Sequence, residues 1–531
     1  MPTRFPPARI IPPLLLIWGF LLATVSVPLY RIRIVAGYTF LAILLVWWLS
    51  RGTGRVDLTR RAAAVVLAVT AVVIMRVPTF TYLDAGSADT VRALFASAAL
   101  GAALLFCTPW RHAGPAALAL GIVGHVVGGI VLIHEDPTPH IDVWYTLQGA
   151  ADALAAGENP YTQVWTSSWT VMRSFTYLPW TAVLLAPGRW LAGDVRWTLL
   201  TINVLTAVVI ALLPTLAARG RRAAAPGRPA EDSDGSGSAG PTDPAEPTDP
   251  AEPTDAAGPA DPAVQARLRD AAAACAVLLL LLPGTPTQLE QAWTEPVLLA
   301  CVVLALAALL GGHGRLALVP LALSLASKQH MALLLPLLAV WRWAGPRAAA
   351  AVAGGAGALV LPWFLMDPAA FWHDTVQYLV DFPPIKFADT LYIAAVKHLS
   401  WQPPFWFTGA IVLGCLVGIG LAVRRRDPGP AQFLRWCSLM LLLANLVNKQ
   451  AFYNQFWLAG ALLLLSWAVP DPICPTVRKT PDRKTPDRKT SEQTASEQGV
   501  AGQQTAQSEG QLVPAPPLTD PGPPPPAERA S

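Results

Sequence analysis

The chain is organised around one polar interruption of an otherwise apolar sequence, residues 134–162, which reads HEDPTPHIDVWYTLQGAADALAAGENPYT. The middle of this stretch predicts a short amphipathic helix over about residues 144–156, because apolar and polar side chains recur there at helical spacing. The apolar face carries Trp144, Leu147, Ala151 and Leu154. The other face carries Tyr145, Gln148 and Asp152. We expect this helix to lie on a membrane surface.

Local signals bound this helix on both sides. Gly157 is expected to end it, and Asn159 and Pro160 are expected to turn the chain. Asp142 precedes the first turn, where a helix N-terminus favours a negative charge. An acid held at the boundary between water and lipid is therefore our candidate for the chemistry.

The composition is that of a polytopic membrane protein. The 531 residues are 53% hydrophobic and only 14% charged, and the mean hydropathy is +0.43, far from the values of a soluble globular protein. Apolar runs near the roughly 20 residues needed to cross a bilayer recur along the chain. Because only helices and closed barrels satisfy their own backbone in lipid, we predict an all-α bundle of about 12–14 hydrophobic segments in the cell membrane.

Charge and cysteine content exclude several classes of function. The net charge of +4 is small for this length and does not suggest a nucleic-acid partner. The six cysteines are scattered without metal-ligand spacing, so we interpret them as packing residues and predict no metal site and no cofactor. A requirement for a divalent ion in catalysis is left open.

Basic residues predict the topology of the N-terminal transmembrane part, residues 1–133. Hydrophobic segments are expected near residues 11–29, 34–50, 62–78, 91–109 and 114–133. The loop over residues 51–61 carries four arginines, whereas residues 79–90 contain no lysine or arginine. Since positive loops stay inside, we expect a cytoplasmic N-terminus and place the loop over residues 134–174 outside.

The next part, residues 134–217, creates a conflict in this topology. Two apolar segments, at about 175–191 and 198–217, follow the outside loop. Residues 218–266 begin with three arginines and continue as the repeat PTDPAEPTDPAEPTD, which predicts a disordered linker. Two full spans would put those arginines outside, against the positive-inside rule. One of the two segments is therefore expected to be re-entrant, and the pattern does not say which.

The C-terminal half, residues 267–469, alternates apolar segments with polar breaks. The segments are expected near 271–282, 297–310, 348–365, 405–423, 431–447 and 456–469, and one more is broken into two short halves, 316–326 and 331–343. A second large outside loop is expected at residues 367–404. Broken helices at membrane depth are tolerated where they line a cavity. Residues 470–531 are rich in Pro, Gln, Lys and Arg and predict a disordered cytoplasmic tail.

Several motifs carry a resemblance to a known family. Residues 142–145 read DVWY, and residues 151–161 fit A-x-x-L-x-x-G-E-N-P-Y. Tyr177-Leu-Pro179 with Pro187, a polar break over residues 288–295, and Lys328-Gln329 with Pro336 follow in the family's order. With these motifs the chain resembles the polyprenol-phosphate-mannose-dependent glycosyltransferases of the GT87 family, within the GT-C superfamily. Five spans before the loop, where the family has one, and the linker 218–266 are departures.

The resemblance implies a hexosyltransferase that moves mannose from a polyprenyl-phosphate donor to a cell-envelope glycan or glycolipid outside the membrane. We expect direct displacement with inversion, because the sequence offers no identifiable second carboxylate as nucleophile. The resemblance also implies that Asp142 is the essential acid. Such a reaction needs a base for the acceptor hydroxyl and a cation for the departing phosphate. Asp136 and Glu135 are rival candidates for the base, and these two could as easily be solvated loop charges. That none of the three acids is the base is the remaining alternative.

Polar residues at the helix breaks are the remaining candidates. For the donor phosphate these are Lys328, Gln329 and His330, with Lys449 and Gln450, because ionisable groups at membrane depth are costly and usually face a cavity or a partner. The candidates for other substrate contacts are Tyr145, Gln148, Asn159, Tyr161, Tyr177, Glu290, Glu295 and Tyr453. Each group has a structural alternative: a snorkelling lysine, a plain loop, or packing.

Two other functions compete with transfer. A transporter or flippase of lipid-linked substrates would also use broken helices with lysines, and an inactive scaffold would tolerate Asn at position 142. All three interpretations expect membrane lipids as partners.

Overall fold

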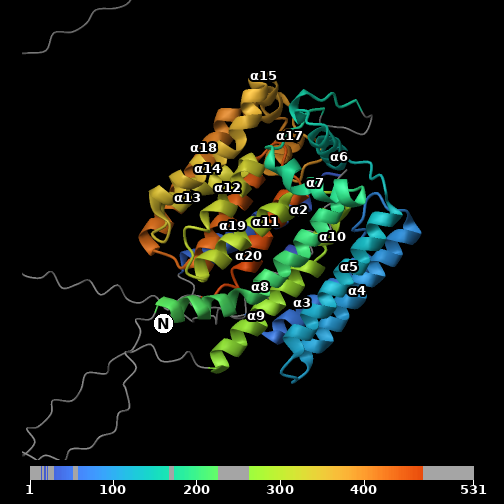
Figure 1. Cartoon of the computed structure of the whole chain (residues 1–531), viewed down its shortest axis with the longest axis vertical. Helices are drawn as coiled ribbons and strands as arrows, with labels where there is room; N and C mark the ends of the chain where they lie inside the picture. Colours follow the sequence, from blue (N-terminus) through green and yellow to red (C-terminus); the bar gives the residue numbers. More distant parts are fainter. Residues whose placement is uncertain are drawn as a thin grey trace, which may run out of the picture. The chain divides into compact units, whose positions relative to one another are not determined.

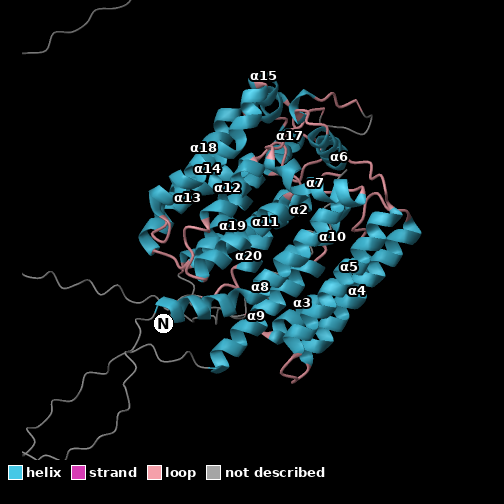
Figure 2. Cartoon of the chain, in the orientation of Figure 1, coloured by secondary structure: helices cyan, strands magenta, loops and turns pink. Residues whose placement is uncertain are grey.

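The computed structural model describes residues 14, 17–19, 21, 29–51, 58–166, 173–224 and 262–470. Among these residues every secondary-structure element of more than one residue is a helix, which confirms the all-α prediction (Figures 1 and 2). Most of the predicted first segment, the linker and the tail lie outside the described residues. The helices before the linker are α2 (Ile32–Ser50), α3 (Arg60–Arg76), α4 (Ala85–Cys107), α5 (Ala113–Glu135), α6 (Asp142–Ala155), η2 (Pro160–Thr162), α7 (Trp180–Ala192) and α8 (Arg196–Ala224).

The helices after the linker form the rest of the bundle. They are α9 (Pro262–Leu281), α10 (Gly284–Glu290), α11 (Glu295–Leu310), α12 (Leu318–Ser327), η3 (Gln329–Leu334), α13 (Leu335–Val340), α14 (Gly345–Met366), α15 (Pro368–Trp372), η4 (His373–Gln377), α16 (Tyr378–Asp381), α17 (Leu391–Leu399), α18 (Phe405–Arg426), α19 (Pro430–Val447) and α20 (Tyr453–Leu465). The second predicted loop thus contains a short run of helix, α15–η4–α16, and the separate helix α17.

Seven of the described helices are long and apolar enough to cross a bilayer: α2, α4, α5, α8, α14, α18 and α19. Helices α9 and α10 together make an eighth such span, bent by 45° at the break between them. The chain is therefore a multi-pass membrane protein. Fewer spans qualify than the number of hydrophobic segments expected, because α11, α12 and α20 have only 16, 10 and 13 residues.

Helix α7 accounts for the conflict in the predicted topology. Its 13 residues extend about 20 Å, too little for a hydrocarbon core of about 30 Å. Just before it, Leu178 N–H donates to Ser327 O at 3.2 Å, and just after it, Gly193 O accepts from the side chain of Gln148 in α6 at 3.3 Å. Helix α8, with 29 residues, is long enough to cross and ends among the arginines. We therefore assign α7 as the segment that does not cross.

The termini of three short helices meet at one end of the bundle, which we call the cavity end. Helix α11 begins at Glu295, α12 ends at Ser327 next to Lys328, and α20 begins at Tyr453 next to Asn454. Lys328 and Asn454 both contact Glu295, so these three helix ends meet. Helices α6, α15 and α17 lie at this end (Figure 1).

The opposite end carries arginines that form ion pairs with residues from distant parts of the chain. Arg60 pairs with Asp270 at 2.8 Å, and Arg342 pairs with Asp427 at 2.7 Å. The apolar interior lies between the two ends. It buries almost all of α20 and the part of α9 from Ala271 to Leu281. Cys275, which is buried in α9, packs there as the sequence predicted.

Candidate functional site

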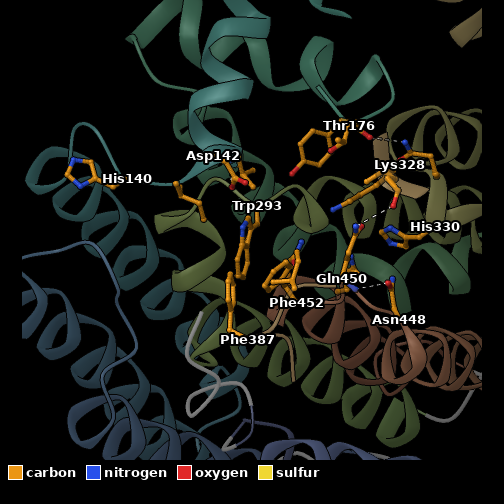
Figure 3. Close-up of a pocket in the computed structure, with 18 of the residues that line it drawn as sticks. His140, Asp142, Thr176, Trp293, Lys328, His330, Phe387, Asn448, Gln450 and Phe452 are labelled. Atoms are coloured by element: carbon orange, nitrogen blue, oxygen red, sulfur yellow. Dashed lines mark hydrogen bonds between the residues drawn. The ribbon is translucent and has the colours of Figure 1, made fainter. Parts of the chain in front are cut away.

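A cavity of about 290 Å³ opens at the cavity end (Figure 3). It is lined by Tyr82, His140, Ile141, Asp142, Val143, Thr176, Tyr177, Trp293, Lys328, Gln329, His330, Leu379, Ile385, Phe387, Asn448, Gln450, Phe452, Asn454 and Gln455. Six of the predicted site residues line it: Asp142, Tyr177, Lys328, Gln329, His330 and Gln450. They come from four separate parts of the chain, so the fold gathers them.

Asp142 reaches the cavity from the first residue of α6. Its Oδ1 accepts the backbone N–H of Val143 at 2.8 Å. In Figure 3, Asp142 lies across the cavity from Lys328 and His330, with the rings of Trp293, Phe387 and Phe452 below it. The carboxylate and the ammonium thus face one space from different walls.

The two rival acids do not line the cavity. Glu135 ends α5 and accepts the hydroxyl of Ser87 at 2.6 Å. Asp136 is buried, and burial raises the pKa of its carboxyl, although the charge of Arg196 opposes this shift. Among the three acids of this loop, only Asp142 is placed to contact a molecule in the cavity.

Lys328 is held by a buried ion pair. Its Nζ lies 2.5 Å from Glu295 Oε1 and 3.2 Å from Thr294 Oγ1, and 5.2 Å from the centre of the Tyr177 ring. Asn454 Nδ2 donates to the same carboxylate oxygen at 2.8 Å. An ammonium has three N–H donors, and two protein oxygens among the described residues accept hydrogen bonds from this one.

The two residues after Lys328 differ in their hydrogen bonds. Gln329 Nε2 donates to Thr176 O at 2.8 Å and to Thr375 O at 3.1 Å. His330 Nε2 is buried and has no hydrogen-bond partner among the described residues. A buried polar atom of this kind needs an explanation. The His330 side chain lines the cavity, although Nε2 itself is covered.

The segment between α19 and α20 forms another wall of the cavity. Gln450 lines it and donates Nε2 to Leu379 O at 3.3 Å. Lys449 does not line it, because its Nζ donates to Val380 O and Phe382 O, each at 2.6 Å. Burial lowers the pKa of Lys449, with Asp381 opposing the shift. The structure thus gives Lys449 a structural partner instead of a ligand-facing position.

The residues predicted for substrate contact in the first loop mostly have structural partners. Gln148 holds the backbone of residues 193 and 195, with Nε2 to Gly193 O at 3.3 Å and Val195 N–H to Oε1 at 3.2 Å. The Asn159 side chain caps η2 by accepting Tyr161 N–H at 3.1 Å, and Tyr161 Oη donates to Tyr177 O at 2.9 Å. None of these three lines the cavity.

The remaining predicted contacts also lie outside the lining. Tyr145 packs edge-on against Trp165. Glu290 is fully buried and accepts the N–H groups of Thr81 and Tyr82 at 2.6 and 2.8 Å. Tyr453 Oη donates to Gly284 O at 2.9 Å. Glu295 acts on the cavity only through Lys328 and Asn454, so the prediction that it contacts acceptor hydroxyls gains no support.

Sequence reasoning missed the residues that fix α6. Arg196 is fully buried, and its guanidinium donates to both oxygens of Asp194, at 2.7 Å in the shortest contact, and to Asp136 O at 2.6 Å. Asp194 Oδ2 also accepts the indole N–H of Trp144 at 3.0 Å. Trp144 stands two residues after Asp142, so this pair positions the start of α6. The only signal for it was one arginine at the start of an apolar run.

The cavity thus combines a carboxylate, a paired ammonium, an imidazole, carboxamides and aromatic rings, which suits binding of a polar organic molecule. Within the described ranges no group of three His, Cys, Asp or Glu residues could hold a metal ion. No protein-family model matches this chain, and no curated protein matches it.

Proposed function

We propose that the chain is a membrane glycosyltransferase that moves a sugar, mannose, from a polyprenyl-phosphate donor to a cell-envelope glycan or glycolipid, as a relative of the GT87 family. One observation carries this proposal: Asp142 and Lys328 line the same cavity, at an end of the bundle where short helices stop. A base and a cation on different walls of one cavity are what displacement of a phosphate by a hydroxyl requires.

In the proposed reaction the acceptor hydroxyl oxygen attacks the anomeric carbon as the bond from that carbon to the phosphate oxygen breaks. Asp142 takes the hydroxyl proton. The electron pair of the broken bond leaves with the polyprenyl phosphate, which the remaining N–H of Lys328 and the ring of His330 stabilise. Attack opposite to the leaving group inverts the anomeric centre. Glu295 and Asn454 hold Lys328 in place.

The test is transfer of tritiated mannose from polyprenyl-phosphate mannose to a cell-envelope glycan fraction by the purified chain in detergent. Asp142→Asn keeps the size of the side chain and removes the base, so we expect transfer to fall about 10²- to 10⁴-fold. The matched control is Asp89→Asn, which alters a well-exposed acid on α4 paired with Arg92. Undiminished transfer by Asp142→Asn would remove Asp142 as the base.

Transport of a lipid-linked substrate is the second candidate. The observation in its favour is the 45° bend between α9 and α10, because transporters use interrupted helices. Proteoliposomes carrying labelled polyprenyl-phosphate mannose separate the two: a flippase moves the label between leaflets and leaves it on the lipid, whereas a transferase moves it to the glycan.

A further inference from the structure

Three carboxamides in the cavity wall share a fixed orientation. Gln329, Gln450 and Asn454 all line the cavity. The amide nitrogen of each is used internally: by Thr176 O and Thr375 O for Gln329, by Leu379 O for Gln450, and by Glu295 Oε1 for Asn454. Every one of these partners is an oxygen that only accepts hydrogen bonds. The nitrogen and oxygen ends of the three amides are therefore not interchangeable.

The consequence is a wall with three carbonyl acceptors. Gln329 uses both of its amide N–H groups internally, whereas Gln450 and Asn454 each use one and keep the other. The structure shows no hydrogen bond to the three amide oxygens within its described ranges. A ligand satisfies these oxygens only with hydrogen-bond donors, which an ionised phosphate or carboxylate lacks, whereas a sugar hydroxyl can both donate to the oxygens and accept from the remaining N–H groups.

The rest of the wall suits a neutral ring. Trp293 and Phe452 line the same cavity and provide flat apolar faces (Figure 3). The charge of Lys328 is balanced by Glu295 at 2.5 Å, and Lys449 turns its ammonium to the carbonyls of residues 380 and 382. Hydroxyl donors combined with apolar C–H faces are the chemistry of a pyranose.

We infer that Gln329, Gln450 and Asn454, with Trp293 and Phe452, form a subsite for a neutral sugar ring whose hydroxyls donate to the three amide oxygens. This deepens the proposed transfer reaction and rests on it for the role of the sugar. It also moves the donor phosphate away from Gln329 and Gln450 and toward Lys328 and His330. The ring is either the mannosyl group of the donor or a sugar of the acceptor.

The test measures binding without turnover, by saturation-transfer NMR on the purified full chain in detergent. The probes are methyl α-mannoside and mannose 6-phosphate. We expect the wild type to prefer the neutral mannoside. Gln450→Lys retains a donor for Leu379 O but replaces the amide oxygen by a cation, so the mannoside affinity should fall about three- to tenfold, as for loss of one hydrogen bond, and the affinity for mannose 6-phosphate should rise.

Matched variants separate the possible causes. Gln163→Lys alters a carboxamide outside the cavity that likewise donates its nitrogen to an oxygen, Glu158 Oε2 at 2.9 Å, and should change neither affinity. Gln329→Lys repeats the exchange at a second position, in case Gln450→Lys does not fold. Mannose 6-phosphate binding as tightly as the mannoside to the wild type would overturn the inference, and so would equal mannoside affinities in the wild type and both cavity variants.

Two further arms separate this inference from the proposed reaction and identify the sugar. Asp142→Asn should lose transfer and keep mannoside binding. If the wild type binds the sugar but does not transfer it, the proposed transfer reaction is refuted and the sugar subsite is not. Displacement of the mannoside by polyprenyl-phosphate mannose assigns the subsite to the donor ring. Continued binding beside the donor assigns it to the acceptor.

Discussion

Removal of the Asp194 carboxylate should destabilise the protein far more than removal of an exposed acid on α6. Arg196 has 0% exposure, and three of its hydrogen bonds go to Asp194, at 3.1, 3.0 and 2.7 Å. Asp194→Ala leaves this guanidinium buried with one hydrogen bond among the described residues, to Asp136 O, and with the partly protonatable Asp136 carboxyl as the nearby acid. Breaking a buried pair in this way costs about 3–5 kcal/mol, because a charge remains uncompensated.

The control is a second ion pair between neighbouring parts of the same region. Asp152 in α6 pairs with Arg189 in α7 at 2.7 Å, but the two side chains are 51% and 34% exposed. Asp152→Ala should therefore cost about 0–1 kcal/mol. The free energies of unfolding come from titration with SDS in mixed micelles. Equal losses for the two variants would refute the claim that burial of Arg196 decides the effect.

A double variant tests the cause directly. Asp194→Leu with Arg196→Met removes both charges and fills similar volume, and such replacements of buried pairs are often neutral. We expect it to recover most of the stability that Asp194→Ala loses. A double variant as unstable as the single one would mean that the contact of Asp194 with Trp144, at 3.0 Å, matters more than the charge.

The remaining predictions concern the start of α6 and the buried acid Asp389. Trp144→Phe removes the indole hydrogen bond to Asp194 and should lower the turnover number about three- to tenfold without changing the mannoside affinity. The control is Trp190→Phe, which removes a similar hydrogen bond, to Ala151 O at 2.9 Å, at the far end of α6. This control should change neither the turnover number nor the mannoside affinity. Burial raises the pKa of Asp389 from 3.8 to about 7, so the native state binds this proton more tightly than the unfolded chain. The stability from Asp389 is thus complete below about pH 4 and is lost as the pH rises through 7; Asp389→Asn should flatten that slope in SDS titrations between pH 5 and 8.

The sequence predicted most reliably what short-range signals determine. Gly157 adopts a φ of +73° just after α6, as its place at the helix end predicted. Asn159 caps η2 through its own side chain. Most apolar segments coincide with a helix, because an apolar run identifies a helix without reference to any other part of the chain. Their bounds were less accurate where polar residues continue the helix: α4 begins at Ala85 instead of residue 91, α8 ends at Ala224 instead of residue 217, and α9 begins at Pro262 instead of residue 271.

What the sequence could not predict depends on contacts between distant residues. Gln148 lay on the polar face of the predicted helix, yet it is buried because the turn at residues 193–195 packs over it. An apolar run also does not say whether it crosses. Helix α7 is apolar enough to resemble a span, and only its length and its bonds to Ser327 and α6 distinguish it.

The same reasoning explains why the cavity itself was not visible in the sequence. The polar breaks at residues 288–295, 328–330 and 449–450 could each be seen separately, and each had a structural alternative: a plain loop, a snorkelling lysine or packing. The fold brings the breaks to one place, where Glu295 contacts Lys328 and Asn454 across 33 and 159 residues of sequence. A buried lysine is costly at membrane depth unless it is paired, so Glu295 makes the position of Lys328 possible. Because that pair has no net charge, the proposed reaction needs the remaining N–H of Lys328 and the ring of His330 for the phosphate, and it leaves the three amide oxygens for the sugar.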